Sequence, residues 1–270
     1  MKAGRRLRTF RGPSQVRSVS FSPDGLLLAA GGVSTVQVWQ VRALKTATAL
    51  GPYQNPTGLG VVAVLFASDS RTVISGMDDG TIRLTDVTTG TPMRTMKANG
   101  LYSLALSPHN GTLVSGEHNG AGLWDLQRHI LVERLGAIAP DPGTLYEFEH
   151  VGISGDGRWV ATYFRQKGGS DLILWDARRR IEVLALRPPT RQDWAVRGLS
   201  FSPDSRALAV ATPDRVVVKT VKSGTVSALL HAPSPDGRSN PSLEGLAYSP
   251  DGSMVAFGNS RVVIVWTLKQ

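Results

Sequence analysis

Apolar and polar residues alternate in short runs along the whole chain, and turn residues separate the runs. Val19 and Phe21 alternate with serines, a continuous apolar run follows at 26–30, and VQVW follows at 36–39. Alternation with a period of two predicts half-buried strands, while a short continuous apolar run is consistent with a strand buried on both faces. The 29 glycines and 16 prolines are spread along the chain. The sequence therefore predicts an all-β protein of many short strands joined by turns.

The predicted strands are grouped in a repeat. The phrase Ser-Pro-Asp-Gly at 22–25 returns, in full or altered form, from positions 67, 107, 154, 202 and 249, with spacings of 40 to 48 residues. Pro presets φ at the second position of a turn and Gly tolerates a positive φ, so the phrase predicts a tight turn between the first two strands of each repeat. A third strand and a weaker fourth strand, such as 92–96 or 182–186, complete each repeat. A repeat of this length is expected for the blades of a propeller.

The third predicted strand carries a more specific signal at its end, where four of the six repeats have tryptophan. The six positions are Trp39, Thr85, Trp124, Trp175, Lys219 and Trp266. Two of these tryptophans are followed by aspartate, and SGMDDGTIRLTD (75–86) resembles the middle of a WD repeat. The chain thus resembles the WD-repeat β-propeller family over essentially its whole length. The resemblance implies four-stranded antiparallel blades and a role as an assembly platform.

Six blades are visible, and seven is the alternative because it is the commoner number in the family. The chain ends at VIVWTLKQ (263–270), a third strand, and begins with GRRLRTFRG (4–12), which looks like an unpaired fourth strand. We expect the N-terminal strand to complete the last blade and close the ring, which removes free sheet edges. Residues 1–270 are then a single domain. The resemblance also implies a hydrogen-bonded network in each blade, but few of its residues are present, so most blades are expected to rely on apolar packing.

Composition excludes several classes of function. The chain has no cysteine, which excludes disulfides and thiolate metal sites. It has no apolar run long enough for a transmembrane helix and no signal-peptide pattern, so a monomeric cytoplasmic protein without membrane insertion is expected. No metal-ligand spacing, nucleophile elbow or phosphate-binding loop is present, which predicts a non-catalytic protein without cofactor or metal. The five histidines are expected to be structural or solvated: His109, His118, His129, His150 and His231.

The leading hypothesis is a scaffold that binds a protein or peptide partner at its top face, where second strands lead to third strands and one blade leads to the next. Long connections occur there at 51–60, 136–145, 187–194 and 231–242, and the segment 163–171 is expected to be an enlarged loop. Loops on rigid scaffolds often carry function. The alternative for the aromatic residues is that they fill gaps between blades. The candidate partner-binding residues are Tyr53, Tyr102, Tyr146, Arg165, Lys167, Trp194 and Arg197.

Charge supports a second hypothesis, in which the opposite, bottom face binds a polyanion such as nucleic acid or an acidic surface. The net charge is +9, and residues 1–50 hold eight basic residues and one acidic residue. A basic surface attracts polyanions in a salt-dependent way. Aspartates in neighbouring turns partly cancel this charge. The candidate basic residues are Arg5, Arg6, Arg178, Arg179 and Arg180. Two further alternatives are an enzyme with an unrecognised site in the central channel and a propeller module of a larger regulatory protein.

Overall fold

The computed structural model describes twelve stretches of the chain: residues 9–12, 15–33, 35–42, 45–51, 60–109, 111–136, 147–166, 169–185, 195–213, 215–231, 244–258 and 263–268. These residues form 23 strands, and no helix occurs among them. The chain divides into two compact units, Met1–Lys97 and Ala98–Gln270. Each unit is described separately below. Whether residues 1–270 act as a single domain stays a prediction.

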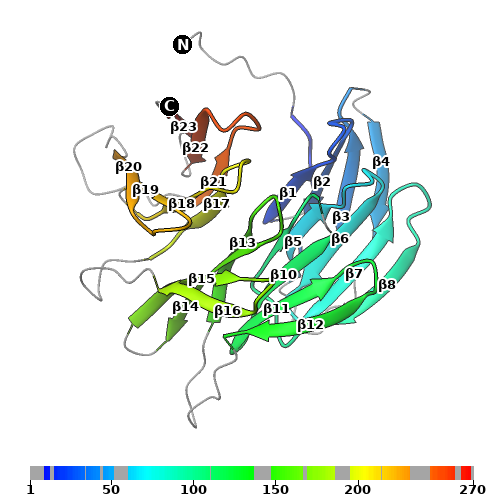
Figure 1. The fold of residues 1–270 in the computed structure, drawn as a ribbon. Helices are drawn as coiled ribbons and strands as arrows, with labels where there is room; N and C mark the ends of the chain where they lie inside the picture. Colours follow the sequence, from blue (N-terminus) through cyan, green and yellow to red (C-terminus); the bar gives the residue numbers. More distant parts are fainter. Residues whose placement is uncertain are drawn as a thin grey trace. The chain divides into compact units, whose positions relative to one another are not determined.

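The first unit contains two antiparallel four-stranded sheets, each made of four consecutive strands (Figure 1). Blade 1 comprises β1 (Ser18–Phe21), β2 (Leu27–Gly31), β3 (Val36–Gln40) and β4 (Lys45–Leu50). Blade 2 comprises β5 (Val61–Phe66), β6 (Thr72–Met77), β7 (Thr81–Asp86) and β8 (Pro92–Lys97).

The second unit contains four more antiparallel sheets of consecutive strands. Blade 3 comprises β9 (Ser103–Leu106), β10 (Thr112–Glu117), β11 (Gly120–Asp125) and β12 (Ile130–Leu135). Blade 4 comprises β13 (Glu147–Ile153), β14 (Trp159–Gln166), β15 (Gly169–Asp176) and β16 (Ile181–Ala185). Blade 5 comprises β17 (Gly198–Phe201), β18 (Ala207–Ala211), β19 (Arg215–Thr220) and β20 (Val226–His231). Blade 6 comprises β21 (Glu244–Tyr248), β22 (Met254–Gly258) and β23 (Val263–Thr267).

Six such sheets in succession define the fold class. In every sheet each strand pairs with the next strand of the chain, which is the topology of a propeller blade. The prediction of an all-β propeller with six antiparallel blades is confirmed. Blade 6 has three strands among the described residues, and the N-terminal strand that was predicted to complete it lies largely outside them, since residues 1–8 are not described.

The repeated Ser-Pro-Asp-Gly phrase is a hydrogen-bonded turn. In blade 1 the Gly25 N–H donates to the carbonyl of Ser22 (2.8 Å), and Gly25 has a φ of 69°. The Ser22 hydroxyl donates to Asp24 Oδ1 (2.5 Å) and accepts the N–H of Leu27 (2.9 Å). The same serine-to-aspartate bond recurs in blades 4, 5 and 6. The predicted turn is therefore confirmed, and its Ser and Asp side chains are used within it.

The aspartate of the WD dipeptide shapes the turn between the third and fourth strands. Asp125 Oδ1 accepts the N–H groups of Gln127 (2.9 Å) and Arg128 (3.0 Å), and Asp176 Oδ1 accepts the equivalent two N–H groups in blade 4. Just before this turn, the pairing of third and fourth strands shifts register in all five four-stranded sheets. Such a bulge bends the outer strand and increases its twist.

Apolar side chains fill the space between neighbouring blades. In the first unit, Val38 and Leu50 of blade 1 share a buried cluster with Val64 and Phe66 of blade 2. In the second unit, blades 3 and 4 meet in a cluster around Phe148, which is fully buried and stacked on Phe164 with ring centres 4.8 Å apart. Because the inner strands of these blades are buried, they carry long apolar runs, such as Leu27–Gly31 and Ala207–Ala211.

Candidate partner-binding surface

The predicted top-end residues are only partly within the described structure. Tyr102, Arg165 and Arg197 are described. Tyr53, Tyr146, Lys167 and Trp194 lie outside the described residues, as do most residues of the four long connections. The geometry of the candidate surface therefore comes from blades 3, 4 and 5 of the second unit.

Tyr102 lies against His118 at the top end of blade 3. The phenol oxygen is 3.1 Å from His118 Nδ1, and the two rings meet edge to face with centres 5.1 Å apart. Gly100 makes this contact possible: it has a φ of +68°, and a Cβ there would lie 2.2 Å from His118 Cδ2. Both rings are half-buried. Tyr102 is thus held in one orientation while part of its surface stays exposed.

A buried carboxylate anchors the same part of blade 3. Glu117 is fully buried, and its side chain accepts the Asn99 N–H (2.9 Å) and the Ser115 hydroxyl (2.5 Å) and pairs with Arg134. Ser115 in turn accepts the Trp124 indole N–H (2.7 Å). Blade 3 is therefore an exception to the predicted reliance on apolar packing. Blade 4 has a smaller counterpart, in which the Trp175 indole donates to Thr162 Oγ1 (2.9 Å).

The segment predicted as an enlarged loop in blade 4 is instead a long hairpin. Strands β14 and β15 pair without interruption to Gln166 and Gly169. The prediction of a loop at 163–171 was wrong because Tyr163 and Phe164 are both buried. Successive side chains of a strand point to opposite faces, and both faces of this hairpin are covered.

Arg165 and Arg197 both act on strand β13 at this end of blade 4. Arg165 Nε lies 3.1 Å from Glu149 Oε1, with the arginine side chain 57% exposed. The neighbouring His150 stacks on Tyr163, with ring centres 6.0 Å apart. Burial, together with the charge of Arg197, lowers the pKa of His150 below 6.5, although a backbone contact with Val196 opposes the shift. The two predicted arginines therefore belong to one polar cluster.

Protonation of His150 is expected to destabilise the protein. Because its pKa is lower in the folded than in the unfolded chain, its contribution to stability is complete above pH 6.5 and is lost as the pH falls below that value through the folded-state pKa. His150→Gln should flatten the fall of the melting temperature over this range. The matched control is His109→Gln, a change at an exposed histidine. Parallel curves for wild type and His150→Gln between pH 7 and 5 would contradict the assignment.

The predicted basic face has some acidic neighbours where it is described. Arg180 lies 3.4 Å from Glu133, and Arg179 donates its backbone N–H to Asp176. Burial opposes ionisation of Asp156, but a hydrogen bond from Ser154 and the charges of Arg178 and Arg158 keep its pKa below the usual value. Arg5 and Arg6 lie outside the described residues. Arg178 and Arg180 thus have acidic neighbours, which weakens the case for a polyanion site.

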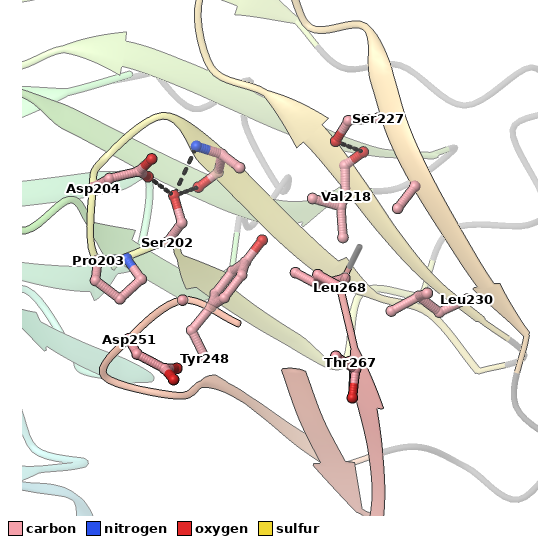
Figure 2. Close-up of a pocket in the computed structure, with 13 residues that line it drawn as sticks. Ser202, Pro203, Asp204, Val218, Ser227, Leu230, Tyr248, Asp251, Thr267 and Leu268 are labelled. Atoms are coloured by element: carbon pink, nitrogen blue, oxygen red, sulfur yellow. Dashed lines mark hydrogen bonds between the residues drawn. The ribbon is translucent and has the colours of Figure 1, made fainter. Parts of the chain in front are cut away.

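A separate cavity of about 660 Å³ lies between blades 5 and 6 of the second unit (Figure 2). Sequence reasoning missed it, because its residues come from turns and strands that look like ordinary parts of the repeat. Its lining residues include Ser202, Asp204, Val218, Leu230, Tyr248, Asp251 and Leu268.

Two kinds of feature can be assessed in the described residues: metal-binding clusters and membrane-spanning helices. They include no group of three or more histidines, aspartates or glutamates that could hold a metal ion. No helix of membrane-spanning length and apolarity is found among them either.

The fold and the repeated turns define the class of this protein as a six-bladed β-propeller of antiparallel sheets. The family model for the WD domain, G-beta repeat, matches residues 4–40 and 52–86. These two stretches of the chain are therefore similar to WD repeats, which supports the resemblance seen in its sequence.

Three relatives show the range of similar proteins. Target of rapamycin complex subunit LST8 of Saccharomyces cerevisiae is 24% identical over 206 residues, which cover 74% of this chain and 65% of that protein. Eukaryotic translation initiation factor 3 subunit I of Lodderomyces elongisporus is 30% identical over 115 residues, covering 37% and 32%. WD repeat-containing protein 3 of Mus musculus is 26% identical over 117 residues, covering 42% and 12%. The matches thus span less than two thirds of each relative.

Proposed function

We propose that this chain is a non-catalytic scaffold that binds a protein partner through the top ends of blades 3 and 4. The observation that carries the proposal is that two pairs of side chains are held in place by mutual contacts yet remain partly exposed. These pairs are Tyr102 with His118 and Arg165 with Glu149. Tyrosine and arginine are the residue types that most often anchor interfaces. Two of the relatives are named as subunits, one of a complex and one of a translation initiation factor. A role within a larger assembly in the cytoplasm is consistent with this.

The rigidity of the set favours binding. Tyr102 is held by His118, and the backbone beside it is tied to Glu117 through Asn99. Arg165 extends from a strand that is paired along its whole length. Side chains that are already held in place lose little conformational freedom when a partner binds, so more of the contact energy contributes to affinity.

The test is a pull-down from source-cell lysate with wild type and Tyr102→Ala/Arg165→Ala as baits. The double variant should capture at least tenfold less of the specifically bound protein than wild type does, because two anchoring side chains are removed from the proposed surface. The control bait is Arg178→Ser/Arg179→Ser, which changes the opposite ends of the blades. Melting temperatures of all baits establish that they are folded.

The outcomes separate the two functional hypotheses. Equal capture by wild type and the Tyr102/Arg165 variant would rule out the proposed surface. Loss of capture with the Arg178/Arg179 variant, or on nuclease treatment, would transfer the function to a polyanion site.

A further inference from the structure

One residue that lines the cavity between blades 5 and 6, Tyr248, differs in type from the equivalent residues of the other repeats. The residue just before the turn phrase is apolar in the five other repeats and tyrosine here. The six positions are Phe21, Phe66, Leu106, Ile153, Phe201 and Tyr248. In the first unit Phe66 fills this position and is 6% exposed, within an apolar cluster between blades 1 and 2. Packing at this position therefore requires only an apolar side chain, and the hydroxyl of Tyr248 is an addition.

That hydroxyl is buried and has no hydrogen-bond partner among the described residues. Figure 2 shows the ring of Tyr248 between Asp204 and Asp251, with its hydroxyl directed toward the space beside Val218. Burial and the nearby charge of Asp204 raise the pKa of Tyr248 to about 12, so the phenol keeps its proton and can donate. A buried donor without an acceptor is unfavourable, and a ligand that supplies the acceptor removes this penalty.

The rest of the cavity combines apolar walls with negative charge. Val218, Leu230 and Leu268 line it, and so do Asp204 and Asp251. Hydrogen bonds from Ser249 and from the Ser253 N–H lower the pKa of Asp251 to about 2, so this carboxylate is ionised at neutral pH. Asp251 forms no ion pair with any described residue, whereas the charge of Arg206 helps to lower the pKa of Asp204. Within the described part of the chain, no cation is therefore paired with Asp251.

We propose that this cavity binds an extended segment of a partner protein that presents an arginine or lysine next to a leucine or phenylalanine. The apolar side chain occupies the space between Val218, Leu230 and Leu268. The cation pairs with Asp251, and the Tyr248 hydroxyl donates to a backbone carbonyl of the segment. A volume of about 660 Å³ lies in the range of ligand-binding cavities. This site is separate from the top-end surface and does not depend on it.

The test uses capped dipeptides as probes for the intact protein, with Arg-Leu and Arg-Phe as ligands and Gln-Leu and Glu-Leu as matched controls. Binding is measured by calorimetry and by the rise in melting temperature. The arginine peptides should bind at least tenfold more tightly than Gln-Leu, and Glu-Leu should not bind, because its charge repels Asp251. Binding of the arginine peptides should weaken with salt.

Tyr248→Phe is the decisive variant. Since phenylalanine occupies the equivalent position in three other repeats, the variant is expected to fold with an equal or higher melting temperature. It should nevertheless bind Arg-Leu about tenfold more weakly, since the hydrogen bond is lost. A purely structural tyrosine would leave binding unchanged on this substitution.

Two matched pairs test the rest of the site. Leu230→Ala should weaken binding, whereas Leu229→Ala should not, because Leu229 is 46% exposed and does not line the cavity. Asp251→Asn and Asp24→Asn disturb the same kind of turn, but only Asp251→Asn should reduce peptide binding. The proposal is overturned if no peptide binds, which is the result expected if other residues of the chain fill the cavity. It is equally overturned if argininamide or leucinamide alone binds as tightly as the peptides.

Discussion

Replacing Arg134 with alanine is expected to lower the free energy of unfolding by about 3 kcal/mol, because it leaves the carboxylate of Glu117 buried without its cation. Glu117 is fully buried, whereas the Arg134 side chain is 35% exposed, so the effect should lie at the lower end of the range for buried pairs. Ser115 and the Asn99 N–H remain as donors to the carboxylate. For a chain of this size the loss corresponds to a fall in melting temperature of about 10 °C.

Two variants distinguish this explanation from a general sensitivity of blade 3. Arg128→Ala removes an arginine that is 78% exposed and lies 3.7 Å from Asp125, and it should change stability by less than about 0.5 kcal/mol. Glu117→Leu/Arg134→Met replaces both charges with apolar groups and should recover most of the loss. If Arg134→Ala melts within 2 °C of wild type, the pair does not stabilise the blade.

Much of the fold follows from short-range signals in the sequence. The Ser-Pro-Asp-Gly turn is local: its serine, aspartate and glycine form hydrogen bonds within six residues of one another. Its spacing therefore reveals the repeat directly. The strand pattern is equally local, because residues two apart share one face of a strand. These signals suffice for the fold class and the number of blades.

The buried network of blade 3 could not be predicted in the same way. Blade 2 has Ser75-Gly76-Met77 where blade 3 has Ser115-Gly116-Glu117, and both Met77 and Glu117 are buried. A glutamate at the end of a strand normally indicates an exposed position. Only the approach of Arg134 and Asn99, which are 17 and 18 residues away in the chain, makes the burial of Glu117 possible.

The candidate sites show the same limit. Arg165 was predicted on a loop, but Tyr163 and Phe164 are buried on the two faces of a hairpin, so it lies on a strand. Tyr248 looks like one more aromatic residue before a turn. Its significance depends on the absence of a hydrogen-bond partner among the described residues, which is a property of three-dimensional packing and not of sequence.

The second prediction with a large expected effect on stability concerns Gly116. It lies inside strand β10, where it pairs with Ala121 on one side and Ser103 on the other. A Cβ at this position would lie 2.1 Å from the carbonyl oxygen of Phe148 and 2.6 Å from Ser103 Oγ. The carbonyl belongs to the backbone of blade 4, so it cannot move aside as a flexible side chain could. Glycine is therefore required for the first strand of blade 4 to approach blade 3.

Gly116→Ala is expected to lower the free energy of unfolding by about 3 kcal/mol, measured by chemical denaturation. The sign is informative, because replacing a strand glycine with alanine usually stabilises a protein by about 0.5–1 kcal/mol when space is available. Gly155→Ala is the matched control: its nearest neighbour is the carbonyl oxygen of Pro203 at 3.4 Å, and it should change stability by no more than about 0.5 kcal/mol. Equal stabilities of the two variants would show that blades 3 and 4 separate without significant cost, and that the close approach at Gly116 does not determine their packing.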